Sequence, residues 1–254
     1  MVRQKKSSLF ILIAMFFVFS VFFAENISTV SAQNTQQTVD TAKIFCEGCE
    51  LIRQKKYAEA AKVFEKVVEA DPTKRGAHTN LSWMYLELGR YEDSVAAAQK
   101  EIALYPESSM AHNNLGFSLT QLGKFEEAIL ELQKAIALDF RNTKAHINLA
   151  YAFSSLKRYE AAVSTLEFLT ESNPNYAQGY ASLASAAMMA GQKEKAIKAS
   201  RTYVNLNPDS VPALIGLADN YLSVGNKKAA LEQYKIIKEL DSAAAEALLT
   251  RINR

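Results

Sequence analysis

Glycine and proline are scarce in this chain, with 9 and 5 of 254 residues. Both residues disfavour the interior of a helix, glycine through its backbone entropy and proline through its missing N–H and its ring. Alanine, the strongest helix former, is abundant. The composition is therefore typical of a helical protein.

Neither sign of charge is in excess once the N-terminal segment is set aside. The chain holds 29 Lys and Arg and 27 Asp and Glu, of which residues 1–32 carry three and one. The remainder has 26 of each. Because nucleic-acid-binding domains usually carry a basic surplus, we expect no nucleic-acid partner.

Sequence motifs of catalysis are also missing. There is no phosphate-binding loop, no nucleophile elbow and no paired-carboxylate arrangement, only Glu and Lys at the surface positions of helices. We therefore expect neither an enzyme nor a cofactor.

A long apolar run occurs at the N-terminus, from Leu9 to Ala24, interrupted only by Ser20. Basic residues precede it, and Val30-Ser31-Ala32 follows as a cleavage-like site, so residues 1–32 are predicted to be an export signal. The alternative is an uncleaved anchor, although 16 residues are short beside the roughly 20 that cross a bilayer. Residues 33–40 are polar and read as a linker. The protein is expected to be exported, periplasmic or secreted, with any membrane attachment through this segment alone.

The rest of the chain repeats with a period of 34 residues. Residues 109–142 hold two amphipathic runs joined by a Gly-Lys-Phe turn, with copies before and after in the same register. A fixed period of this size marks a repeat array. Proline stops the second run in four of the units, and glycine between the runs predicts a left-handed helix C-cap. The predicted units are residues 41–74, 75–108, 109–142, 143–176, 177–210 and 211–242.

The spacing of Leu, Gly or Ala, Tyr, then Ala, a large apolar residue and Pro within each unit resembles the tetratricopeptide repeat. The resemblance implies an all-α, right-handed superhelical solenoid of six tandem helix-turn-helix repeats, whose first helices line a concave groove. Residues 243–254 resemble the opening of a seventh first helix and are expected to form a C-terminal capping helix, because an array needs a polar-faced end. Departures from the pattern occur at Glu47, Ser94, Lys193 and Lys227.

The resemblance also implies a ligand along the first helices. In the second to fourth units an Asn precedes an aromatic residue by three places, so both lie on one helix face. Asn can hydrogen-bond a peptide backbone and the aromatic ring adds apolar contact area. The alternatives are that Asn is common there in the family whatever the ligand, and that a shifted helix phase puts the rings in the core. The predicted partner-binding residues are Asn80, Trp83, Leu86, Asn114, Phe117, Asn148 and Tyr151, with Met188, Met189 and Leu222 continuing the apolar lining.

Cys46 and Cys49 form a C-E-G-C sequence with four possible states: a disulfide, a reduced pair, half of a metal site or a redox couple. Export favours the disulfide. No second CxxC exists and Glu50 follows in place of His, which speaks against structural zinc and c-type haem.

The histidines, His78, His112 and His146, share the fourth place of three consecutive units. Packed helices lie roughly 8–10 Å apart, whereas zinc–nitrogen bonds measure about 2 Å. Three histidines on successive helices therefore do not converge readily on a metal. We expect helix-interface histidines and no metal site.

These observations predict an exported scaffold or assembly factor that binds a protein or peptide segment in the groove between Asn80 and Tyr151. Two alternatives remain: a self-associating structural array, which would be a homo-oligomer, and a thiol–disulfide redox protein that uses Cys46 and Cys49.

Overall fold

The computed structural model describes residues 41–253, and every regular element among them is a helix. The predicted export signal and linker, residues 1–40, lie outside the described residues. A helical segment over residues 41–53 begins the described chain. It is followed by α2 (Tyr57–Ala70), α3 (Ala77–Glu87), α4 (Tyr91–Leu104), α5 (Ser109–Gln121), α6 (Phe125–Leu138), α7 (Thr143–Ser155), α8 (Tyr159–Ser172), α9 (Ala177–Met189), α10 (Lys193–Leu206), α11 (Val211–Ser223), α12 (Lys227–Leu240) and α13 (Ser242–Ile252).

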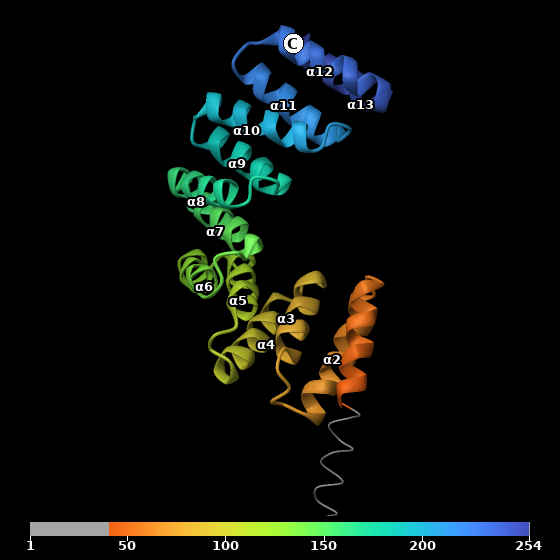
Figure 1. The fold of residues 1–254 in the computed structure, drawn as a ribbon, viewed down its shortest axis with the longest axis vertical. Coiled ribbons are helices and arrows are strands. Elements are labelled where there is room, and N and C mark those ends of the chain that lie inside the picture. Colours follow the sequence, from red (N-terminus) through yellow and green to blue (C-terminus); the bar gives the residue numbers. More distant parts are fainter. Residues whose placement is uncertain (1–40, 254) are drawn as a thin grey trace, which may run out of the picture.

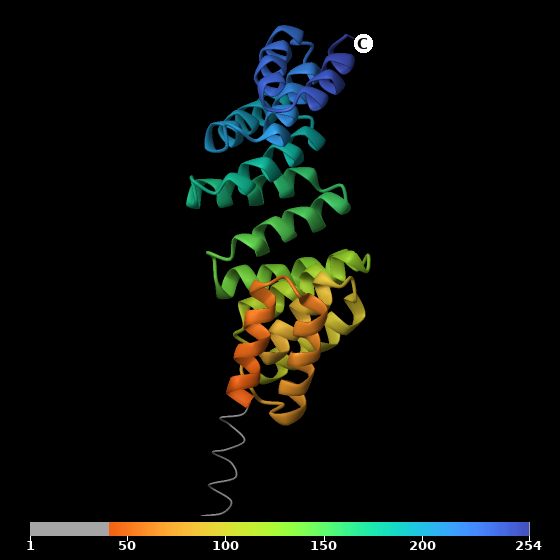
Figure 2. The same ribbon diagram turned by 90° about the vertical axis from the view of Figure 1, so that its right-hand side faces the viewer.

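The helices form pairs that stack in chain order into an elongated array (Figures 1 and 2). Each pair consists of a first helix, such as α3 or α5, and the second helix that follows it, such as α4 or α6. The first helices α3, α5, α7 and α9 also contact one another in turn. The predicted all-α solenoid of helix-turn-helix units is therefore confirmed. Within residues 41–253 no helix has both the length and the hydrophobicity of a bilayer span.

The core lies between the helices of neighbouring pairs. In the pair α5–α6, apolar residues at helical spacing are buried, with Leu115 and Leu119 at most 6% exposed and Ala128, Leu132 and Ala135 at 0%. Small residues allow close approach of the two helices. A Cβ added at Gly116 would lie 2.5 Å from Leu132 Cγ, so only glycine fits there.

In each of the six units, one residue in the turn between the two helices has a left-handed backbone conformation. Gly89, Gly123, Gly191 and Gly225 have φ between 71° and 76°, as their position predicted. Lys55 and Lys157 occupy the same place with φ 58°. A side chain is disfavoured in this conformation, and hydrogen bonds hold the lysine turns in it. After Lys157, Arg158 N donates to Phe153 O at 2.9 Å. The glycine turn at Gly89 has the equivalent bond, from Arg90 N to Tyr85 O at 2.8 Å.

The last helix departs from the regular spacing. Four residues separate α10 from α11, whereas Asp241 alone separates α12 from α13. Asp241 accepts a hydrogen bond from Ala244 N at 3.0 Å and so caps α13. The predicted boundary after residue 242 consequently falls one residue inside this helix.

Ser94, which departs from the repeat pattern, belongs to a buried cluster of hydroxyl groups. Ser82, Ser94 and Ser118 come from α3, α4 and α5, and all three are 0% exposed. Ser94 Oγ lies 2.8 Å from both Ser82 Oγ and Ser118 Oγ. The polar side chain thus replaces alanine because two other helices supply partners for its hydroxyl group.

Candidate functional site

The predicted aromatic row lies on one face of the first helices α3, α5 and α7, where Trp83 also packs against the core formed by α2, α3 and α4. Trp83 on α3 and Phe117 on α5 are half-buried, and Tyr151 on α7 is 51% exposed. The lysine at the start of α7 shows how this face curves. Lys144 Nζ lies 5.1 Å from the centroid of the Trp83 ring, although α5 stands between α3 and α7. The face is therefore concave enough for one side chain to bridge two units.

The aromatic row opens onto two adjoining cavities. The first groove pocket, between α3, α5 and α7, measures about 380 Å³. It is lined by Trp83, Leu86, Glu87, Tyr91, Asn113, Asn114, Phe117, Lys144, Ile147 and Asn148. The second groove pocket, between α5, α7 and α9, measures about 400 Å³. It is lined by Phe117, Gln121, Ile147, Asn148, Ala150, Tyr151, Ser154, Leu166, Ser182, Ser185, Ala186 and Met189.

Phe117, Ile147 and Asn148 belong to both pockets and form the wall between them. The predicted partner-binding residues other than Asn80 all line one pocket or the other. Met189 lines the second groove pocket, whereas Met188 packs against the core of α8 and α9, and Leu222 packs against the core near the C-terminus. The structure thus brings the aromatic row together at one surface and leaves Met188 and Leu222 outside it.

Asparagine side chains link the first helices beneath this surface. Asn148 Nδ2 donates to Asn113 Oδ1 at 2.9 Å, and Asn114 Nδ2 donates to the Thr79 carbonyl oxygen at 3.1 Å. Asn114 is 6% exposed, so its amide group already joins α5 to α3 and is not presented to a ligand. Asn113 accepts the hydrogen bond from Asn148. The sequence analysis did not predict a role for Asn113, although the adjacent pair Asn113-Asn114 could have indicated one.

The charges of the first groove pocket are arranged around Trp83. Its indole Nε1 donates to Glu87 Oε1 at 2.8 Å, while Lys144 lies over its ring. A cation–π contact at an exposed site contributes about 0.5–1 kcal/mol. Together these contacts fix the orientation of the ring within the groove.

Family models of the tetratricopeptide repeat match residues 47–109, 85–145 and 119–186. The chain belongs to the tetratricopeptide-repeat family. A comparison with curated protein sequences finds no match.

Solved structures of other tetratricopeptide-like arrays share the fold. PilW, a type IV pilus biogenesis factor, is 20% identical with a TM-score of 0.73, over 82% of this chain and 98% of that one. PilF of Pseudomonas aeruginosa is 16% identical with a TM-score of 0.68, over 85% and 99%. YrrB, described as having an unusual peptide-binding site, is 18% identical with a TM-score of 0.57, over 75% and 99%. At these identities the likeness concerns the fold.

Within this tetratricopeptide array the three histidines lie at helix interfaces. His78, His112 and His146 are 3–5% exposed. Each places Nε2 within 3.2 Å of the carbonyl oxygen six residues earlier, in the loop before its helix. His112 also places Nδ1 2.6 Å from Glu131 Oε2, and the His146 ring lies 5.5 Å from the centroid of the Phe168 ring. Burial lowers the pKa of His78. Among residues 41–253 no group of three metal-ligating side chains is placed to hold an ion.

The two cysteines are exposed and unpaired in this array, so the disulfide stays a prediction. Burial and the neighbouring Cys46 raise the pKa of the Cys49 thiol. Reactive redox cysteines have a lowered pKa, because the thiolate is the nucleophile. The raised pKa of Cys49 therefore does not favour thiol–disulfide catalysis at this thiol.

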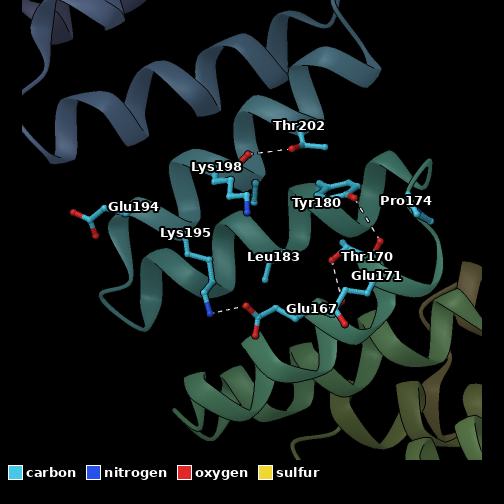
Figure 3. Close-up of a pocket in the computed structure, with 11 residues that line it drawn as sticks. Glu167, Thr170, Glu171, Pro174, Tyr180, Leu183, Glu194, Lys195, Lys198 and Thr202 are labelled. Atoms are coloured by element: carbon cyan, nitrogen blue, oxygen red, sulfur yellow. Dashed lines mark hydrogen bonds and ion pairs between the residues drawn. The ribbon is translucent and has the colours of Figure 1, made fainter.

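A larger cavity of about 560 Å³ lies between the second helices α8 and α10, with α9 beneath it (Figure 3). Glu167 and Lys195 form an ion pair of 2.6 Å across one side of it, and the Tyr180 hydroxyl donates to the Thr170 carbonyl oxygen at 3.4 Å. Three carboxylates and two amines line it, so this cavity selects no single charge of ligand. Its charged lining residues are Glu167, Glu171, Glu194, Lys195 and Lys198.

Proposed function

We propose that this tetratricopeptide-repeat protein is an exported scaffold or assembly factor that binds a segment of another protein along its first helices. The observation that carries the proposal is the aromatic row Trp83, Phe117 and Tyr151, which opens onto two adjoining pockets. Partly exposed aromatic side chains grouped at a concave surface are typical of interaction sites. Catalysis has no comparable support.

The partner segment would contact the aromatic rings and the amide groups beside them. Burying a large apolar side chain contributes about 1.5–3 kcal/mol. Asn148 has a carbonyl oxygen available to a peptide N–H, since its Nδ2 is the atom bound to Asn113. Asn114 contributes by holding α5 against α3, and its replacement would act through the geometry of the groove.

Export is supported by the sequence of residues 1–32, with basic residues, an apolar run and a cleavage-like site in order. The likeness of the fold to PilW, a type IV pilus biogenesis factor, is consistent with a role in assembly. Mass spectrometry of the purified protein tests the export signal: a mature N-terminus near Gln33 supports it, and an intact Met1 or Val2 contradicts it.

Affinity capture tests the binding site. The full chain and the variant Phe117→Ala/Tyr151→Ala are used as bait in parallel with Leu130→Ala/Phe168→Ala, which truncates two side chains of the second helices that are 59% and 49% exposed. Loss of one aromatic contact costs about 1.4 kcal/mol or more, which is tenfold in affinity. The groove variant should therefore lose the partner while the control retains it. Equal recovery by all three baits would refute the site.

A further inference from the structure

The row of paired side chains breaks off at α9, which forms one side of the second groove pocket. The Asn–aromatic pair recurs every 34 residues up to Asn148 and Tyr151, and the next step falls on Ser182 and Ser185. Both serines line the pocket, beside Ala186. Where the preceding first helices carry an amide and a ring, α9 carries two hydroxymethyl groups, so small side chains and Met189 form the α9 side of this pocket.

The two groove pockets differ in charge. Glu87 and Lys144 line the first, whereas all lining residues of the second are uncharged. The floor of the second is apolar, with Leu166, Ala186 and Ala150 between 1% and 3% exposed. Tyr151 and Met189, 51% and 47% exposed, stand at its rim. A charged group that entered would lose its hydration without gaining a counter-charge.

We infer that the second groove pocket takes a large uncharged apolar side chain, preferably an aromatic one, from the partner segment. This inference rests on the proposed function of the groove and names the side chain that its partner must present. The volume of about 400 Å³ accommodates an indole or phenyl group. Phe117 and Tyr151 offer ring edges and faces to such a group, and the Met189 thioether adds a soft, polarizable contact.

Titration of the full chain with small amino-acid amides tests this selectivity. The probes are N-acetyl-tryptophanamide, N-acetyl-lysinamide and the N-acetyl amide of glutamic acid, followed by amide chemical shifts in two-dimensional NMR. The tryptophan probe should shift resonances of α7 and α9 at concentrations where the two charged probes leave them unchanged. Equal shifts from a charged probe would overturn the inference.

A substitution that fills the second groove pocket provides a second test of this inference. Ser185 is exposed and stands at the aromatic position of its helix, so Ser185→Trp fills the pocket without entering the core. Its matched control is Ser164→Trp, at an exposed position of the second helix α8. Ser185→Trp should weaken binding of the tryptophan probe at least tenfold, and the control should leave it unchanged. Undiminished binding to Ser185→Trp contradicts the inference.

The same variants separate this inference from the proposed function. If Phe117→Ala/Tyr151→Ala loses the captured partner while Ser185→Trp retains it in full, the groove is the binding site and the pocket inference is wrong. If neither variant loses the partner, both are wrong. A dimer in light scattering that disappears in Ser185→Trp would identify a second copy of this chain as the occupant and overturn the assignment to another protein.

Discussion

Replacement of Gly116 by alanine tests how closely α5 packs on α6 beside the aromatic row. The new Cβ would lie 2.5 Å from Leu132 Cγ and 3.1 Å from the Ala128 carbonyl oxygen. Leu132 is 0% exposed and the second atom is backbone, so neither can move aside without disturbing the core. Overpacking of this kind costs about 1–3 kcal/mol.

Alanine also favours the helix by about 1 kcal/mol relative to glycine, which opposes the clash. For a contact as short as 2.5 Å in a fully buried place the clash dominates. Gly116→Ala is therefore expected to lower the free energy of unfolding by about 1–2 kcal/mol. Gly216, in the interior of α11, is the matched control, because a Cβ added there meets nothing within 4 Å. Gly216→Ala should raise the free energy of unfolding by about 0.5–1 kcal/mol.

Urea unfolding of both variants, followed by far-UV circular dichroism, measures the difference. Because repeat arrays can unfold in steps, the fluorescence of Trp83 is recorded in parallel as a local probe of α3. In a Leu132→Ala background the effect of Gly116→Ala should shrink or change sign, since the Leu132 Cγ that makes the 2.5 Å contact is gone. If Gly116→Ala stabilised the chain as much as Gly216→Ala does, the close approach of α5 and α6 would be refuted.

Three further predictions concern single sites. Lys157→Gly should raise the free energy of unfolding by about 0.5–1 kcal/mol in urea titrations, because φ at this position is 58° and the Cβ is strained there; an unchanged midpoint would contradict this. Asp241→Ala should lower the stability of the C-terminal end by about 0.5–2 kcal/mol in thermal melts through loss of the α13 cap, whereas Asp241→Asn should retain it. Because burial lowers the pKa of His78, the unfolded chain takes up a proton more readily than the folded one as the pH falls below about 6.5. Stability should therefore decline toward pH 5 in melts, and His78→Gln should make that decline shallower; an equally steep decline would assign it to other groups.

Much of the fold could be predicted because the repeat period fixes which residues are equivalent. The glycines at 89, 123, 191 and 225 predicted left-handed turns, and the period places Lys55 and Lys157 at the same position. Residue type alone would not assign these lysines a positive φ. The reason that serine replaces alanine at position 94 could not be predicted from the sequence. The partners of Ser94 come from two other helices, and only packing brings Ser82 and Ser118 to it.

The neighbourhood of the aromatic side chains was predicted, whereas their binding of a partner stays a prediction. The period of 34 placed Trp83, Phe117 and Tyr151 at equivalent positions of three helices, and the structure brings them to one concave surface. The same period treated Asn80, Asn114 and Asn148 as equivalent, yet Asn114 is buried and bound to Thr79. Burial depends on how neighbouring units curve, which no single unit encodes. The pocket at Ser182 and Ser185 was overlooked because its lining comes from several helices and serine carries no signal of an interaction site.

Site-specific photo-cross-linking tests most directly whether a partner protein binds along the first helices. A photo-reactive benzoylphenylalanine is incorporated in place of Tyr151, at the rim of the groove, or in place of Phe168, on the second helix α8; both side chains are about half exposed. If the partner lies along the first helices, irradiation in cells yields a cross-linked partner from position 151 and none from position 168. A cross-link from position 168 with none from position 151 would contradict it.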